Sequence, residues 1–317
     1  MGTVNERASV ALFRVGWGAV RRMPAPAAYR LFDTIAVASA RRQTRDARRM
    51  RANYALVRPE LDAAELDALV VAGMRSYLRY WCDAFRLPEQ TSEQLEDVVR
   101  VVGDGPVRER LAGGGGVVCF LGHLGNWDTV GAWATGHLAP VTTVAERLEP
   151  EELYEQFLAY RQRLGMTILP LTGGDSVFLT LVRTVRAGGL VPLLADRDLT
   201  DKGVEVDFCG HRAQMAAGPA ALSLAARAPL YPVFVHYEPH PDRRPGPAAY
   251  RVVLTFGPVA PQVEGSRPEV IRALTQHCAD QLTGAVREHT EDWHMMQRVF
   301  VGATAPADAG AAGEQTR

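Results

Sequence analysis

Apolar residues in the first part of the chain recur at steps of three and four, the spacing of one helical face. Two such stripes run through residues 8–23 and 26–40, formed by Val10, Phe13, Trp17 and Val20 and then by Tyr29, Phe32 and Ile35. Further helices are expected over residues 43–58 and 62–87. The pattern therefore predicts a helical amino-terminal part over residues 1–95.

From Val117 onward, short apolar runs alternate with helical segments. The run VVCFLG over 117–122 follows glycines 113–116, which indicates a buried strand. Further strands are expected at 141–146, 167–171, 190–196, 204–210, 230–238 and 250–259, and helices at 126–137, 150–164, 175–187, 218–228 and 268–290. This alternation predicts an α/β fold with a mixed central sheet flanked by helices on both faces.

Length and composition agree with one folded unit. The chain has 317 residues, 47% of them hydrophobic, enough for a full core. We expect a single domain over residues 1–302, consisting of the helical part over 1–95 and an α/β catalytic core over 96–302. Residues 303–317 lack bulky apolar side chains and are expected to be a disordered tail. The four cysteines form no C-x-x-C pair, which favours a reducing compartment over a disulfide framework.

The charge is uneven, although the formal net charge is only −1. Residues 1–60 hold twelve arginines against four acidic residues, so this segment is strongly basic. A basic segment with apolar helical stripes suits docking on an anionic membrane surface, and core packing of the same helices is the alternative. No apolar run is long enough to cross a bilayer. Nucleic acid is a weaker alternative partner, because the sequence holds no nucleic-acid motif.

Candidate chemistry is concentrated in FLGHLGNWDT, residues 120–129. His123 directly follows a predicted strand, where α/β proteins collect reactive groups. Asp128 would lie in the first turn of a helix beginning near Asn126, from where its carboxylate can turn back toward the imidazole. A histidine beside a carboxylate acts as a general base. Because the chain has no G-x-S-x-G motif, we expect direct transfer to a substrate hydroxyl without a covalent intermediate.

The segment GHLGNWD, with its H-x4-D spacing, resembles the bacterial acyltransferases of lipid A biosynthesis and, more closely, the phosphatidylinositol mannoside acyltransferases. The similarity covers roughly residues 10–300 and includes RRMRANYALVRPEL (48–61), YRQRLGMTILPLTGGD (160–175), ADRDLTDKGVEVDFCG (195–210) and MAAGPAALSLAARAPLYPVFV (215–235). The resemblance implies transfer of a fatty acyl group, with palmitoyl expected, from acyl-CoA to a mannose hydroxyl of phosphatidylinositol mannoside. It also implies a peripheral enzyme on the cytoplasmic side of the cell membrane.

The same resemblance assigns roles to individual residues. His123 becomes the general base and Asp128 the carboxylate of the motif. Asp196 stands where mannoside acyltransferases usually have a glutamate that supports the histidine. Because aspartate is one methylene shorter, the resemblance leaves open whether Asp128 or Asp196 orients His123. The candidate substrate-binding residues are Arg161, Arg197, Asn126 and Trp127.

Several further expectations accompany this interpretation. Acyl-CoA is a co-substrate, an acyl carrier protein is the alternative donor, and neither a cofactor nor a metal is expected. Backbone N–H groups near Gly125 and Asn126, or a nearby arginine, would stabilise the oxyanion. We expect a monomer. The alternatives are an acyltransferase for another glycolipid or a lysophospholipid, an acyl-thioester hydrolase, and a basic lipid-binding module without catalysis.

Overall fold

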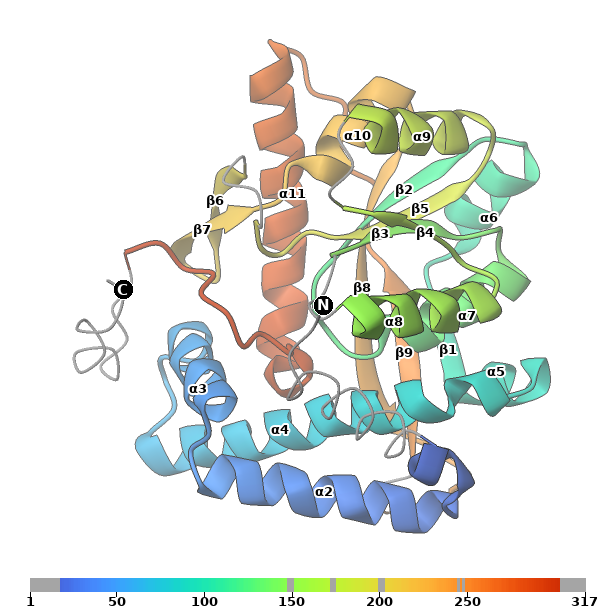
Figure 1. Cartoon of the computed structure of the whole chain (residues 1–317). Coiled ribbons are helices and arrows are strands. Elements are labelled where there is room, and N and C mark those ends of the chain that lie inside the picture. The colour runs from blue at the N-terminus through green and yellow to red at the C-terminus, as the bar shows by residue number, and fades with distance from the viewer. Residues whose placement is uncertain are drawn as a thin grey trace.

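The computed structural model describes residues 18–146, 151–171, 175–198, 203–243, 246 and 249–302. Its helices are α2 (Ala25–Arg41), α3 (Arg45–Val57), α4 (Ala63–Arg86), α5 (Ser92–Val98), α6 (Gly105–Ala112), α7 (Trp127–His137), α8 (Glu151–Arg163), α9 (Asp175–Arg186), α10 (Gly218–Ala226) and α11 (Arg267–Glu288). Its strands are β1 (Val99–Val102), β2 (Val117–Leu121), β3 (Thr142–Ala145), β4 (Thr167–Pro170), β5 (Leu190–Leu194), β6 (Val204–Phe208), β7 (His211–Met215), β8 (Leu230–Pro239) and β9 (Tyr250–Phe256). Most of the helix expected over 8–23, and the tail from 303, lie outside the described residues (Figure 1).

The central sheet has the strand order β1-β9-β8-β2-β5. Strands β8, β2 and β5 are parallel to one another, β9 is antiparallel to β8, and β1 is parallel to β9. The parallel pair β3–β4 continues from the β5 edge through a bridge between Val141 and Leu190. The predicted mixed sheet is therefore confirmed.

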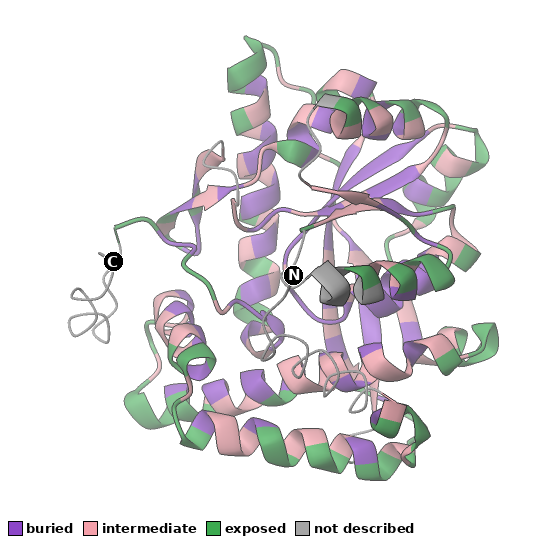
Figure 2. Cartoon of the chain, viewed as in Figure 1, coloured by how far each residue is buried: buried purple, intermediate pink, exposed green. Residues whose placement is uncertain are grey.

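Strand β2 is buried on both faces, as its continuous apolar run predicts. Side chains alternate along a strand, so Val118 and Phe120 join one core cluster while Val117, Cys119 and Leu121 join another. Helices α9, α10 and α11 cover the first face, and α5, α6 and α7 cover the second (Figure 1). Figure 2 shows the buried sheet between these two helical layers, which confirms helices on both faces.

The amino-terminal helices pack beside this core. Helix α2 lies along α4, and α3 packs against the amino-terminal end of α4 (Figure 1). From α3, Asn53 donates side-chain hydrogen bonds to the carbonyls of Met295 and Gln297, which ties the helical part to the carboxyl-terminal segment of the core. Among the described residues, no helix has both the length and the apolar character to span a membrane.

Several expected strands extend past their observed ends, such as the one at 250–259, which ends at Phe256. The largest error concerns a strand that contains a turn. The run VEVDFCG, over 204–210, is a strand only to Phe208, because Cys209 and Gly210 both have positive φ and reverse the chain. The following strand, β7, then pairs antiparallel with β6, with Phe208 opposite His211. A two-residue turn with both residues at positive φ is typical of a tight hairpin. The pattern also missed β7 itself, the four-residue strand β1, and the short helices on either side of β1.

Candidate active site

The loop between β2 and α7 carries His123 and needs glycine at position 125. Gly125 has φ +63°, and a Cβ there would lie 2.4 Å from the carbonyl oxygen of Val235. Asn126 then caps α7, since its Oδ1 accepts a hydrogen bond of 3.0 Å from the backbone N–H of Thr129. The tight turn and the cap together hold His123 at the carboxyl edge of the sheet.

His123 meets Asp196, which follows β5. Leu121 and Leu194 are paired across β2 and β5, and His123 and Asp196 each come two residues later. The Nδ1 atom of His123 lies 2.6 Å from Oδ1 of Asp196, and its backbone N–H donates to Oδ2 at 2.8 Å. Burial alone would raise the pKa of Asp196, but attraction to His123 and the hydrogen bonds that it accepts lower it. The structure therefore makes Asp196 an ionised partner of the imidazole.

Asp128 faces a different partner. It is in the first turn of α7, and Arg161 of α8 donates to both of its oxygens, Nε at 2.8 Å and Nη2 at 3.1 Å. The hydroxyl of Tyr80, from α4, donates to Oδ2 of the same carboxylate at 2.8 Å. The expectation that Asp128 turns back to His123 is wrong, because its carboxylate is occupied by these donors. Of the two carboxylates that the sequence left open, Asp196 is the one that contacts the imidazole.

The Asp128–Arg161 pair is largely removed from water, with side chains 5% and 21% exposed. Burial alone would lower the pKa of the Arg161 guanidinium, but the Asp128 carboxylate and its hydrogen bonds raise it. This bidentate pair holds α7 and α8 together next to the loop of His123.

The remaining three predicted binding residues lie at different depths. Trp127 packs edge-on against the imidazole of His123, with ring centroids 5.4 Å apart, and its Nε1 is buried without a hydrogen-bond partner among the described residues. Arg197 pairs with Glu146 at 3.2 Å, and its Nη1 is buried and similarly unpartnered within the described part of the chain. Asn126 is fully buried, so its side chain serves the interior of the protein.

The Asn126 side chain belongs to a buried polar network. Its Nδ2 donates to Oδ2 of Asp83 at 3.1 Å and to the hydroxyl of Tyr237 at 3.2 Å, and Tyr237 donates to the same Asp83 oxygen at 2.7 Å. The Tyr29 hydroxyl donates to the other oxygen of Asp83. Burial raises the pKa of Asp83 even though these donors oppose the shift. The network links α2 and α4 to the loop that carries His123.

Several residues around His123 gave no signal in the sequence. The chain from 292 to 294 runs beside the loop: the N–H of Gly125 donates to the carbonyl of Asp292, and the N–H of His294 donates to that of His123, both at 2.8 Å. The expected oxyanion donor at Gly125 is therefore already occupied. Trp293 donates its Nε1–H to Oδ2 of Asp196 at 2.9 Å. No motif marks this segment, and none marks Tyr80.

Comparison with known proteins identifies the family. Residues 4–301 match the model of the family described as bacterial lipid A biosynthesis acyltransferase. This chain belongs to that family. It is 37% identical over 290 residues to the phosphatidylinositol mannoside acyltransferase of Mycolicibacterium smegmatis, covering 91% of this chain and 90% of that one. It is 38% identical over 299 residues to the protein of that name from Mycobacterium tuberculosis strain H37Rv, covering 93% and 89%.

Membership of this acyltransferase family confirms the resemblance seen in the motifs, and it supports acyl transfer as the activity of the chain. Within the described residues, no group of three or more His, Cys, Asp and Glu side chains is placed to hold a metal ion. Around the His123 loop, Trp127 Nε1 and Arg197 Nη1 are buried N–H donors without a partner among the described residues.

Proposed function

We propose that this chain is an acyl-CoA-dependent O-acyltransferase that transfers a palmitoyl group to a mannose hydroxyl of phosphatidylinositol mannoside. The observation that carries the proposal is the hydrogen bond between Nδ1 of His123 and the buried Asp196 carboxylate. Relatives named for that activity align with more than nine-tenths of the chain, which supports the acceptor.

In the proposed reaction, His123 is the general base. An ionised Asp196 accepts a hydrogen bond from Nδ1–H, so the proton stays on Nδ1 and the lone pair of the imidazole is on Nε2. Nε2 has no hydrogen-bond partner among the described residues, and the side chain is 18% exposed, so a substrate can reach it. Nε2 removes the hydroxyl proton as the sugar oxygen attacks the thioester carbonyl. The tetrahedral intermediate then collapses, the C–S bond breaks, and the imidazolium returns the proton to the CoA thiolate.

The negative charge on the thioester oxygen needs N–H donors during this step. We assign this role to the indole N–H of Trp127 and the guanidinium of Arg197, because both have a buried N–H group without a partner in the described structure. Such donors cost free energy while unpaired and recover it when an oxyanion forms beside them. The same groups would donate hydrogen bonds to the phosphate or carbonyl oxygens of a bound substrate.

Asp128, Arg161 and Asn126 support the site by position in this proposal. Asp128 anchors Arg161 across the α7–α8 contact through two hydrogen bonds. Asn126 fixes the loop of His123 through its cap and its buried network. The distinction predicts that the main loss is folding stability in Asp128 and Asn126 variants and catalysis in His123 variants.

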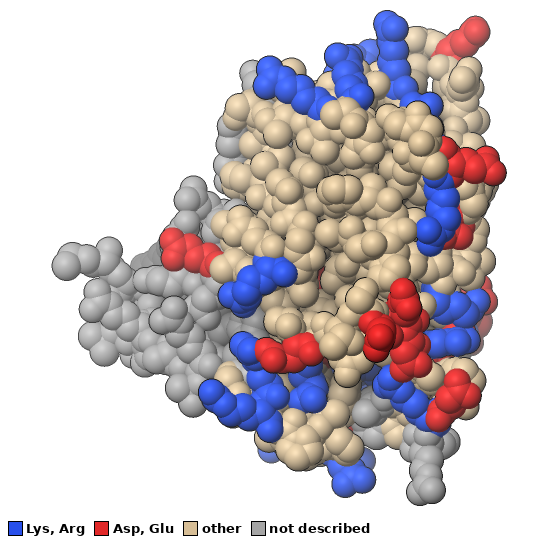
Figure 3. All heavy atoms as spheres, turned by 90° about the vertical axis from the view of Figure 1, so that its right-hand side faces the viewer, with Lys and Arg blue, Asp and Glu red and all other residues tan. Residues whose placement is uncertain are grey.

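Membrane docking is proposed for the outer surface of α2. Leu31 and Ile35 are one turn apart on this helix and are 43% and 44% exposed, and the exposed Arg30 and Arg41 lie on the same helix. Apolar side chains beside arginines suit the interface of an anionic leaflet. The face seen in Figure 3 is different, since acidic and basic side chains lie close together there around a broad uncharged area. Docking through α2 on the cytoplasmic leaflet would bring a lipid-anchored acceptor to the enzyme.

The experiment measures thiol release from palmitoyl-CoA, with and without a phosphatidylinositol mannoside acceptor, and identifies the product by mass. The parent protein is compared with His123→Ala, and with His277→Ala as a matched change of a partly exposed histidine on α11. We expect release and acylated product only when both the acceptor and His123 are present. Acceptor-independent release would instead indicate a hydrolase. Acylation of another glycolipid or of a lysophospholipid in place of the mannoside would mean that the acceptor is that lipid. Unchanged transfer in His123→Ala would refute the assignment of the base.

A further inference from the structure

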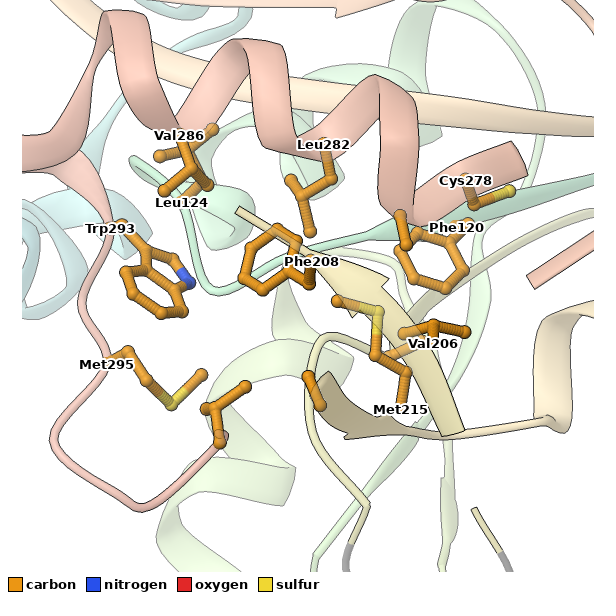
Figure 4. Packing of buried hydrophobic residues seen from close by; sticks show 14 of the residues in the cluster. Phe120, Leu124, Val206, Phe208, Met215, Cys278, Leu282, Val286, Trp293 and Met295 are labelled. Atoms are coloured by element: carbon orange, nitrogen blue, oxygen red, sulfur yellow. The ribbon is translucent and has the colours of Figure 1, made fainter. Parts of the chain in front are cut away.

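Trp293 is the largest fully buried side chain of the described core and has one polar atom to satisfy. Its indole packs against Phe208 of the β6–β7 hairpin, with ring centroids 5.6 Å apart, and lies beside Met295 below α11 (Figure 4). The only hydrogen bond of the Nε1–H goes to Oδ2 of Asp196, at 2.9 Å. A buried indole N–H needs such a partner, and here the partner is the carboxylate behind His123.

The Asp196 carboxylate is held by N–H groups on both oxygens. Oδ2 accepts from the backbone N–H of His123 and from the indole of Trp293, while Oδ1 faces Nδ1 of His123. Two donors on one oxygen fix the rotation of the carboxylate about its Cβ–Cγ bond. The other oxygen is then directed at the imidazole. Trp293 contributes the only one of these donors that comes from outside His123.

The backbone around Trp293 is registered against the same loop. Residues 124 and 293 form an antiparallel bridge, and the backbone hydrogen bonds of Gly125 and His294 flank it. On the other side, the hydroxyl of Tyr54, from α3, donates to the carbonyl oxygen of Trp293 at 3.0 Å. The indole is therefore placed by the loop that it serves and by the amino-terminal helices, and small movements of either are transmitted to Asp196.

We propose that Trp293 is a positioning residue for the acyltransferase reaction, which orients Asp196 through one hydrogen bond. The inference rests on the proposed function, because it concerns the same His123–Asp196 pair. Without the indole donor, the carboxylate can rotate and becomes a stronger acceptor for Nδ1–H. A stronger acceptor retains the proton on the imidazole to higher pH and makes the base less available.

The test is Trp293→Phe, which keeps an aromatic ring in the core and removes the donor. Trp133→Phe is the matched control, because Trp133 is also buried but packs on His137, away from the catalytic pair. We expect kcat of Trp293→Phe to fall about 10- to 100-fold, by analogy with the outer hydrogen-bond partners of metal-bound histidines, with little change in KM. The acidic limb of its kcat/KM profile should move to higher pH, whereas the Trp133→Phe profile should match that of the parent.

The pH profile separates positioning from loss of structure. A smaller folded fraction scales the whole profile down without moving its limb, so the position of the limb is decisive even if Trp293→Phe is less stable. A variant with parent-like kcat and an unmoved limb would overturn the inference. So would a fall in activity that is uniform at every pH and proportional to the loss of folded protein. If the parent itself shows no transfer that depends on His123, the proposed function fails before Trp293 is tested, so the two failures are distinguishable.

Discussion

Replacing Asp196 by asparagine changes the chemistry of one buried position without changing its shape. At the Oδ2 position, the site offers two N–H donors, one from the His123 backbone and one from Trp293. At the Oδ1 position, it offers the Nδ1 atom of His123. An asparagine carbonyl can satisfy the two donors only where Oδ2 now lies. Its NH2 group must then face Nδ1, which becomes an acceptor. The imidazole proton is forced onto Nε2, and the base is lost.

The magnitude follows from this enforced tautomer. In serine proteases, replacing the carboxylate behind the catalytic histidine by its amide lowers kcat by about 10⁴-fold for the same reason. That factor corresponds to about 5 kcal/mol of transition-state stabilisation. We expect a loss of about 10³- to 10⁴-fold in acyl transfer by Asp196→Asn. Product formation measured by mass over long incubations is the suitable assay, because thiol release at this rate approaches background hydrolysis.

The control is the stability of the same variant. Asparagine keeps the side-chain volume and leaves no unpaired buried charge, so the urea midpoint should remain close to that of the parent. Asp196→Glu retains a carboxylate and should keep more activity than Asp196→Asn, although the buried position must accommodate one more methylene. Transfer by a folded Asp196→Asn protein within about threefold of the parent would refute the tautomer argument.

Three further predictions concern stability, read from urea unfolding. Asp128→Asn leaves the largely buried Arg161 without its charge partner and should lower the free energy of unfolding by about 3 kcal/mol. Gly125→Ala places a Cβ 2.4 Å from the Val235 carbonyl at positive φ and should cost more than about 2 kcal/mol or prevent soluble folding. Burial raises the pKa of Asp292 from 3.8 to about 6. Between these pH values the folded state holds a proton on Asp292 that the unfolded chain has lost. The contribution of this group to the free energy of unfolding is therefore present below pH 4 and is lost, by about 3 kcal/mol, as pH rises through 6. Asp292→Asn should therefore gain stability relative to the parent between pH 4 and pH 7.

Matched substitutions separate these mechanisms from general damage. Asp67→Asn breaks an exposed ion pair with Arg51 and should change the unfolding free energy by less than about 1 kcal/mol. Gly136→Ala adds a Cβ that meets nothing within 4 Å and should be neutral or stabilising. Equal losses in Asp128→Asn and Asp67→Asn, or in the two glycine variants, would contradict the roles assigned to burial and to backbone conformation. A stability difference between Asp292→Asn and the parent that is constant from pH 4 to pH 7 would contradict the raised pKa.

The order of elements was readable from the sequence because hydrophobic periodicity is a local property. Strand β2 was expected over 117–122 and spans Val117–Leu121, and the long helix expected at 268–290 spans Arg267–Glu288. The failures occurred where the local signal was short or misleading. The strand expected over 204–210 hid a hairpin turn at Cys209, a residue type that seldom adopts positive φ.

The sequence by itself determined that a histidine stands at the carboxyl end of a buried strand, in a family motif for acyl transfer. Only the tertiary structure decided which carboxylate that histidine uses. Asp128 was the candidate from local spacing, yet it is turned to Arg161. Asp196 lies 73 residues from His123 in the chain, and Trp293 lies another 97 residues beyond Asp196. Strand pairing brings Asp196 beside His123, and core packing brings Trp293 to both. Sequence periodicity reports which residues face the core, but it carries no information about which buried polar groups meet there.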